Sequence, residues 1–157
     1  MNQNRESDSE ISSTTSTPRV NRPDYQDMIE KFENPNNYEI YEEMQHPLVT
    51  VEFLNILIKI DSNTAINNYS KYLKNNQFAL NNINNPSNKE EIADTFLLAK
   101  NKQKNFFCEK ILETIHNKDV LEEIKKRCST PSSSLSNPFL EKLNEKIEKS
   151  NRFCAIS

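Results

Sequence analysis

The residues with the clearest chemical potential close the chain, in the order Cys154, Ala155, Ile156 and Ser157. A Cys followed by two aliphatic residues and a terminal Ser is the pattern that protein prenyltransferases recognise. The thiolate attacks an isoprenoid pyrophosphate, the aliphatic pair fills an apolar slot, and the last residue selects the lipid. Because Ser in that position favours farnesyl, we predict that Cys154 is farnesylated.

These four residues resemble the CaaX box of prenylated proteins. The resemblance implies that Ala155, Ile156 and Ser157 are removed after prenylation and that the new carboxyl group is methylated. Since prenyltransferases are eukaryotic enzymes, it also implies a lipid-anchored protein on the cytoplasmic face of a membrane in a eukaryotic cell. The alternative is a soluble protein in which the motif arises by chance and Cys154 is an exposed thiol.

The other residues capable of chemistry form no recognisable site. Cys108 and Cys128 match no disulfide framework, and an odd number of cysteines without a signal peptide indicates a reducing cytosol. The two histidines, His46 and His116, form no HxxxH pair, and there is no CxxC pair to support a metal site. Without glycine, glycine-rich phosphate-binding loops are excluded. We therefore expect no enzyme activity, no catalytic residues, no cofactor and no metal.

The composition favours an all-α fold, a small helical bundle. Only 34% of the 157 residues are hydrophobic and the mean hydropathy is −0.84, so much of the chain must be solvated. Tight β-hairpins depend on residues that adopt positive φ, and glycine is absent. The net charge of −3 gives no overall attraction to nucleic acid. No apolar run is long enough to span a bilayer.

The sequence pattern predicts five segments along the chain. Residues 1–23 are rich in Ser, Thr and charge, which is typical of a disordered tail. The remaining segments are a helical core domain (24–127), a flexible linker (128–136), an amphipathic helix (137–153) and the CaaX box (154–157).

The core is expected to depend on its most apolar stretch, residues 48–60. We predict a buried central helix there, with a β-strand as the alternative because of its β-branched residues. Ser62 and its neighbours are expected to cap the following helix. The Asn-rich stretch 75–85 is predicted to be a loop, and its apolar residues Phe78, Leu80 and Ile83 are expected to be tucked inward.

The longest helix is expected to follow this loop. Residues 87–90 read as a capping box, with Ser at the cap and Glu three residues later. The apolar stripe of this helix passes through Gln103 and continues to Ile115. Asp119 is expected to cap a final short helix of the core.

The amphipathic helix before Cys154 has one apolar face. That face is predicted to lie against the membrane; it consists of Phe139, Leu140, Leu143 and Ile147, together with Phe153. A single prenyl chain anchors only weakly and needs a second signal. Four basic residues against three acidic ones provide little attraction to anionic lipid between Phe139 and Phe153, so we expect the apolar face to act as that signal. The alternative is that the helix docks on the core.

Two families of signalling proteins share short features with the chain. Ser136-Asn137-Pro138-Phe139, a charged stretch and then Phe153-Cys154-Ala155-Ile156 resemble the tail of G-protein gamma subunits, although the gap between the elements is longer here. The rest of the chain departs from that family, because a gamma subunit is a short helical pair that lies along a beta propeller.

A weaker likeness involves His46-Pro47 followed by Phe53-Leu54, with short helices that end near Phe96 and between Cys108 and Arg127. This arrangement is similar to helical regulators of G-protein signalling. The acidic-Asn-aromatic signature of that family is replaced here by residues 62–66, so no contact residue is transferred.

These observations predict a prenylated peripheral membrane protein that acts as a non-catalytic binding or adaptor module in membrane-associated signalling or trafficking. Its expected partners are a membrane, through the farnesyl group, and a protein such as a G protein or small GTPase, with no nucleic acid. The alternative function is a helical regulator that accelerates GTP hydrolysis by such a partner.

Overall fold

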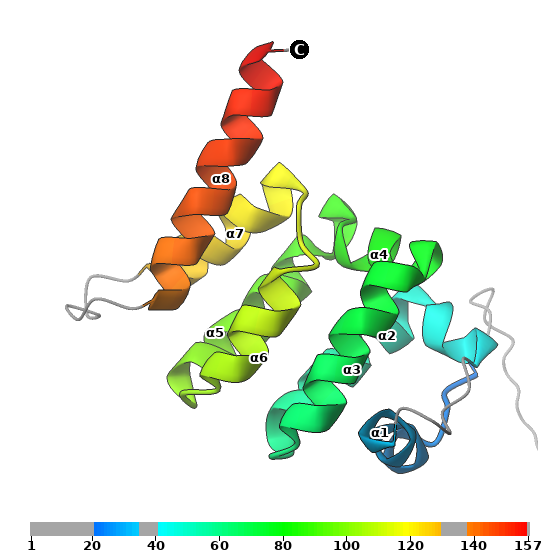
Figure 1. Cartoon of the computed structure of the whole chain (residues 1–157). Helices are drawn as coiled ribbons and strands as arrows, with labels where there is room; N and C mark the ends of the chain where they lie inside the picture. Colours follow the sequence, from blue (N-terminus) through cyan, green and yellow to red (C-terminus); the bar gives the residue numbers. More distant parts are fainter. Residues whose placement is uncertain (1–20, 35–40, 130–137, 157) are drawn as a thin grey trace, which may run out of the picture.

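A computed structural model of the chain describes residues 21–34, 41–129 and 138–156, with side chains placed as far as Asn151. The described residues form helices and no strand, so the predicted all-α class is confirmed (Figure 1). Their α-helices are α1 (Tyr25–Glu33), α2 (Pro47–Lys59), α3 (Asn63–Asn75), α4 (Gln77–Ile83), α5 (Lys89–Asn101), α6 (Asn105–Leu112), α7 (Lys118–Cys128) and α8 (Pro138–Ile156). Two short 3₁₀ helices are η2 (Glu42–Gln45) and η3 (Pro86–Asn88). Most of the predicted tail and linker lies outside the described residues.

The α-helices pack in two rows. One row contains α1, α3, α6 and α8, and the other contains α2, α5 and α7, with each helix in contact with the next in its row. Figure 1 shows α3 and α6 in front of α2 and α5, while α8 closes the stack at its C-terminal end. Helix α4 joins the rows at one side, where it contacts both α2 and α3.

Aromatic side chains fill the N-terminal part of the core. Phe53 of α2 meets Tyr69 of α3 edge to face, with ring centroids 4.7 Å apart, and Phe32 of α1 lies 5.3 Å from the same Tyr69 ring. The hydroxyl groups of Tyr69 and Tyr72 have no hydrogen-bond partner among the described residues. Burial therefore disfavours the phenolate, and it raises the pKa of Tyr72 to about 12.

The predicted central helix and its neighbour are confirmed. In α2, Pro47 occupies the first turn, where a backbone N–H would have no partner within the helix, so the missing N–H of Pro costs nothing. His46 Nδ1 accepts a hydrogen bond from the backbone N–H of Leu48. The side chain of Ser62 caps α3 by accepting from the N–H of Ala65 at 3.1 Å. The β-strand alternative for residues 48–60 is wrong.

The predicted Asn-rich loop is instead the helix α4. The side chain of Asn76 caps it by accepting from the N–H of Ala79 at 3.0 Å. Asn therefore supplies the cap that makes a helix possible here. Ile83 is buried as expected and Leu80 is partly buried, but Phe78 is 67% exposed. The prediction that Phe78 is tucked inward is wrong.

The predicted longest helix is broken into α5 and α6. Gln103 adopts φ 58°, the left-handed region that glycine favours. The N–H of Gln103 donates to Lys100 O, and the N–H of Lys104 donates to Ala99 O at 2.8 Å. These two bonds form the Schellman ending of a helix, built here without glycine.

Two predicted caps are also wrong. The side chain of Ser87 does not cap α5. The backbone N–H of Ser87 instead donates to Asn85 Oδ1, and Asn85 thereby caps η3. Asn88 stands at the start of α5 without a side-chain cap bond. At α7 the cap is Asn117, whose Oδ1 accepts from the N–H groups of Asp119 and Val120.

Candidate functional site

The helix that carries the predicted lipid site is held on the bundle by its apolar face. Phe139 is 6% exposed and stacks on Phe96 of α5, with ring centroids 5.6 Å apart and planes 5° apart. Leu143 and Ile147 are buried, and Leu140 is partly buried against the core. The helix contacts α6 and α7. Its apolar face is therefore covered by protein.

This placement corrects the predicted membrane-facing surface. Phe139, Leu143 and Ile147 face the core and not a membrane, as in the alternative in which the helix docks. The physical reason is that α5, α6 and α7 offer a complementary apolar surface within the same chain, at a high effective concentration. The side chain of Phe153 lies outside the described residues.

Two lysines of α8 extend this contact with polar bonds. Lys142 Nζ lies 3.0 Å from Glu109 Oε2 of α6, in an exposed ion pair. Lys146 Nζ donates to the carbonyl oxygen of Leu112 at 2.6 Å, near the C-terminal end of α6, where a cation is favourable. Burial lowers the pKa of Lys146 to about 8, because desolvation disfavours its charged form.

The predicted lipid site itself cannot be placed beyond its backbone. Helix α8 runs to Ile156, but the side chains of Cys154, Ala155 and Ile156 and the whole of Ser157 lie outside the described residues. The C-terminal end of α8 extends beyond the other helices, whereas its first turns lie beside α7 (Figure 1). Farnesylation of Cys154 stays a prediction.

The two other cysteines lie inside the bundle. Cys108 of α6 and Cys128 of α7 are buried, and burial raises the pKa of their thiols to about 12 and about 11. Such thiols carry little thiolate at neutral pH and are poor nucleophiles. Within the described ranges, no group of three or more His, Cys, Asp or Glu side chains is arranged to hold a metal ion.

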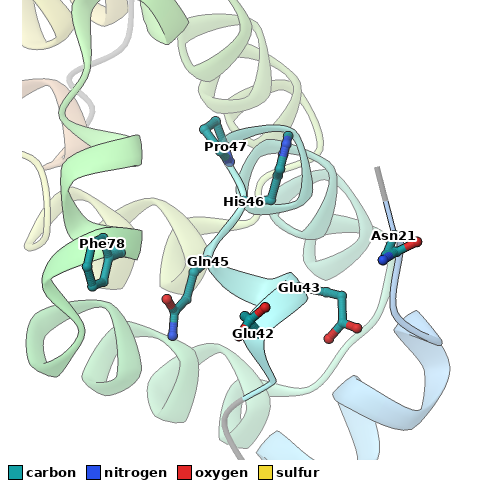
Figure 2. A pocket seen from close by; sticks show the side chains of 7 residues that line it. All are labelled: Asn21, Glu42, Glu43, Gln45, His46, Pro47 and Phe78. Carbon is teal, nitrogen blue, oxygen red and sulfur yellow. The ribbon is translucent and has the colours of Figure 1, made fainter. Parts of the chain in front are cut away.

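A surface hollow on the opposite side of the molecule was not predicted from the sequence. It has a volume of about 440 Å³ and lies where η2 and the start of α2 meet α4 (Figure 2). Its lining consists of Asn21, Glu42, Glu43, Gln45, His46, Pro47 and Phe78. We call it the Phe78 hollow.

Hydrogen bonds between side chains and backbone fix the walls of the Phe78 hollow. Asn82 of α4 donates through Nδ2 to the carbonyl oxygen of Gln45 at 2.6 Å and to Thr50 Oγ1 at 3.2 Å. Thr50 Oγ1 in turn donates to the carbonyl oxygen of His46 at 3.1 Å. Met44, in the middle of η2, is buried in the core. The elements that border the hollow are therefore held together independently of any ligand.

The edge of the hollow near Asn21 is also tied to α2. Arg22 Nε lies 2.9 Å from Glu52 Oε1, and the hydroxyl group of Tyr25 donates to the same oxygen at 2.6 Å. The hydrogen bonds from Arg22 lower the pKa of Glu52. Arg22, assigned from the sequence to the tail, is thus tied to α2 by its ion pair with Glu52.

The signal for this hollow was present in the sequence but depended on recognising α4. In α4 the residues three and four positions after Phe78 are Asn81 and Asn82, both polar. Aromatic residues are enriched at protein–protein interfaces, so an exposed one on a polar helix face is a candidate contact residue for a partner. Because residues 75–85 were assigned to a loop, the exposed position of Phe78 on a helix was not recognised from the sequence.

Comparisons with protein-family models, with curated proteins and with solved structures found no match to this chain. Among the described residues, no helix combines the length and the apolar character needed to cross a bilayer.

Proposed function

We propose that the chain is a farnesylated, reversibly membrane-bound binding module without catalytic groups of its own. The observation that carries the proposal is the order Cys154-Ala155-Ile156-Ser157, which matches a CaaX box at all four positions. The course of α8 supports it, because the end of the helix that bears Cys154 extends away from the bundle (Figure 1). A transferase would approach that end without meeting the other helices.

The docking of α8 limits how strongly such an anchor would hold. A single prenyl chain gives marginal, reversible membrane binding unless a second signal assists it. The apolar face of α8 is covered by the core, and two of its basic residues, Lys142 and Lys146, already contact Glu109 and the Leu112 carbonyl. With α8 docked, the lipid would act almost alone, so membrane attachment would be weak and readily reversed.

The helical core would be the part that binds a partner. Its two buried cysteines, Cys108 and Cys128, are protonated at neutral pH because burial raises the pKa of their thiols. Its surface does carry one hollow with an exposed aromatic side chain, Phe78. Recognition therefore fits this core better than catalysis.

The experiment compares the wild-type chain with Cys154→Ser and Ser157→Leu in a eukaryotic cell. Fractionation measures membrane attachment, and mass spectrometry of the C-terminal peptide identifies the modification. We expect a farnesyl group on the wild-type chain and loss of both the modification and the membrane fraction in Cys154→Ser. Ser157→Leu is the matched control, because Leu at the last position selects geranylgeranyl in place of farnesyl.

An unmodified wild-type peptide that still ends in Ser157 would refute the proposal. A lipid on Cys154 that does not change with Ser157→Leu would refute the reading of the last four residues as a CaaX box. Equal membrane fractions of the wild type and Cys154→Ser would show that the lipid is not the anchor.

A further inference from the structure

The Phe78 hollow combines an exposed aromatic ring with two carboxylates. Phe78 is the second residue of α4 and is 67% exposed, whereas the next residue, Ala79, is buried. Glu42 and Glu43 are consecutive residues of η2 and line the same hollow. Figure 2 shows Glu42 and Gln45 between Phe78 on one side and Glu43 with Asn21 on the other.

Phe78 and Pro47 are the apolar residues that line the hollow. Pro47 lines the hollow, and the next residue of α2, Leu48, is 39% exposed. The described residues contain only one other large hydrophobic side chain with comparable exposure, Leu98 of α5. The exposed ring of Phe78 together with Pro47 provides apolar area in the hollow that a partner can cover.

Within the described part of the chain, no basic side chain forms an ion pair with the carboxylates of the hollow. Every ion pair formed among the described residues uses other acids, such as Glu52, Asp61 and Glu113. Glu42 and Glu43 enter no ion pair or side-chain hydrogen bond there. The hollow therefore presents two negative charges that a cationic ligand would neutralise.

We propose that the Phe78 hollow binds a short linear segment of a partner protein in which a Lys or Arg stands next to an aliphatic or aromatic residue. The cationic group pairs with Glu42 and Glu43 and lies over the face of the Phe78 ring, where a cation–π contact adds to the ion pairs. The neighbouring apolar side chain covers Phe78 and Pro47. Because the walls are fixed by Asn82 and Thr50, the binding surface is formed before the ligand arrives.

This inference rests on the proposed binding role of the core and is independent of the lipid. The test therefore uses the full chain made in bacteria, which lack the protein prenyltransferases that modify CaaX boxes. Absence of peptide binding would not bear on the predicted farnesylation of Cys154. Absence of farnesylation would not bear on peptide binding by the hollow.

The experiment selects binders from a displayed library of random short peptides and measures their affinity by fluorescence anisotropy. We expect the enriched peptides to share a Lys or Arg beside a Leu, Ile, Phe or Trp. Their affinity should fall roughly tenfold or more with Phe78→Ala and also with the double variant Glu42→Gln, Glu43→Gln. These side chains are exposed or half-buried, so the variants keep the fold, which circular dichroism verifies.

Matched variants separate a local site from general charge and hydrophobicity. The double variant Glu90→Gln, Glu91→Gln removes the same charge from another exposed acidic pair, in the first turn of α5. Leu98→Ala shortens the other exposed apolar side chain, which is 36% exposed. Both controls should bind the selected peptides as the wild type does.

Three results would overturn the proposal. The first is an enriched set without basic residues, or no enrichment at all. The second is binding that the controls weaken as much as Phe78→Ala does. The third is a hollow with another occupant: peptides that bind only after removal of residues 1–20 would place the chain's own N-terminal segment there, and a dimer dissociated by Phe78→Ala would place a second copy there.

Discussion

Phe78 and Phe139 are each the second residue of a helix, yet the side chain of one is exposed and that of the other is buried. Phe139 of α8 is 6% exposed and stacks on Phe96, whereas Phe78 of α4 is 67% exposed beside a hollow. Helix α8 extends its apolar face through Leu143 and Ile147, while the helix neighbours of Phe78 are polar. A single aromatic residue therefore does not determine whether a helix docks; the continuity of the apolar stripe around it does.

The two regions are also held by different forces. The α8 contact depends mainly on apolar burial, with Lys142 and Lys146 at its edge. Helix α4 depends on asparagine side chains that bond to the backbone of other elements, above all Asn82 and Asn84. Substitutions that remove apolar volume from the α8 contact should lower the free energy of unfolding. At α4, substitutions that remove asparagine amide groups should do so.

The largest expected effect comes from Phe139→Ala. Removing the ring leaves a cavity against Phe96, so the free energy of unfolding should fall by about 3 kcal/mol or more. Urea unfolding monitored by circular dichroism measures the loss. Phe78→Ala is the matched control, and it should change the free energy of unfolding by no more than about 0.5 kcal/mol. Similar losses for both variants would contradict the comparison.

Asn84→Ala should have the second largest effect. Asn84 Nδ2 donates to the carbonyl oxygens of Leu80 and Thr114, and Oδ1 accepts from the N–H groups of His116 and Asn117. Its removal leaves buried backbone groups without partners, which should lower the free energy of unfolding by about 2 kcal/mol or more.

The control for this variant is Asn81→Ala, in the same helix. Asn81 is exposed, and its Oδ1 accepts only from Gln77 Nε2 at 2.7 Å. Its loss should cost no more than about 0.5 kcal/mol in the same urea experiment. A small loss for Asn84→Ala would show that apolar contacts, and not amide bonds, hold the end of α4.

The smallest expected effect concerns pH and Lys146. Burial lowers the pKa of this residue to about 8 from an ordinary value of 10.5, so the unfolded chain binds its proton more tightly than the folded chain. Between these two values the free energy of unfolding should gain a contribution that rises with pH. Lys146→Met removes this contribution.

The measurement is the difference in free energy of unfolding between the wild type and Lys146→Met across that pH range. The buried thiols of Cys108 and Cys128 have raised pKa values and act in the opposite direction, but they are common to both proteins. The difference should therefore shift in favour of the wild type as pH rises through about 8. A difference that does not vary with pH would contradict burial of the charged Lys146 in the docked helix.

The sequence predicted the fold class because the apolar periodicity of its core helices is strong. Residues 48–60 are so apolar that only a buried helix or strand was possible, and Ser62 marked the start of the following helix because its side chain can cap it. The errors cluster where asparagine or glutamine takes the role that glycine and serine usually have. Asn76 turned an expected loop into a helix, and Gln103 at φ 58° ended a helix whose stripe continued unbroken.

The sites were predicted less well than the fold. Farnesylation of Cys154 stays a prediction, and it depends on a motif that needs no tertiary structure. Whether the apolar face of α8 packs on the core depends on a matching apolar surface on other helices. The periodicity of one helix does not reveal such a surface. Exposure of Phe78 likewise depended on the helical state of its own segment.

The position of α8 at the end of the stack determines how the molecule bears a mechanical load. A pull on the C-terminal end acts first on the contacts of α8 with α6 and α7, because α8 contacts the rest of the bundle mainly through these two helices. Among the described residues, α8 shares no extensive contact with α2 or α4. Traction at this end would therefore peel α8 away before it reached α2 and α4, and the wall of the Phe78 hollow would keep its shape while the tether gave way.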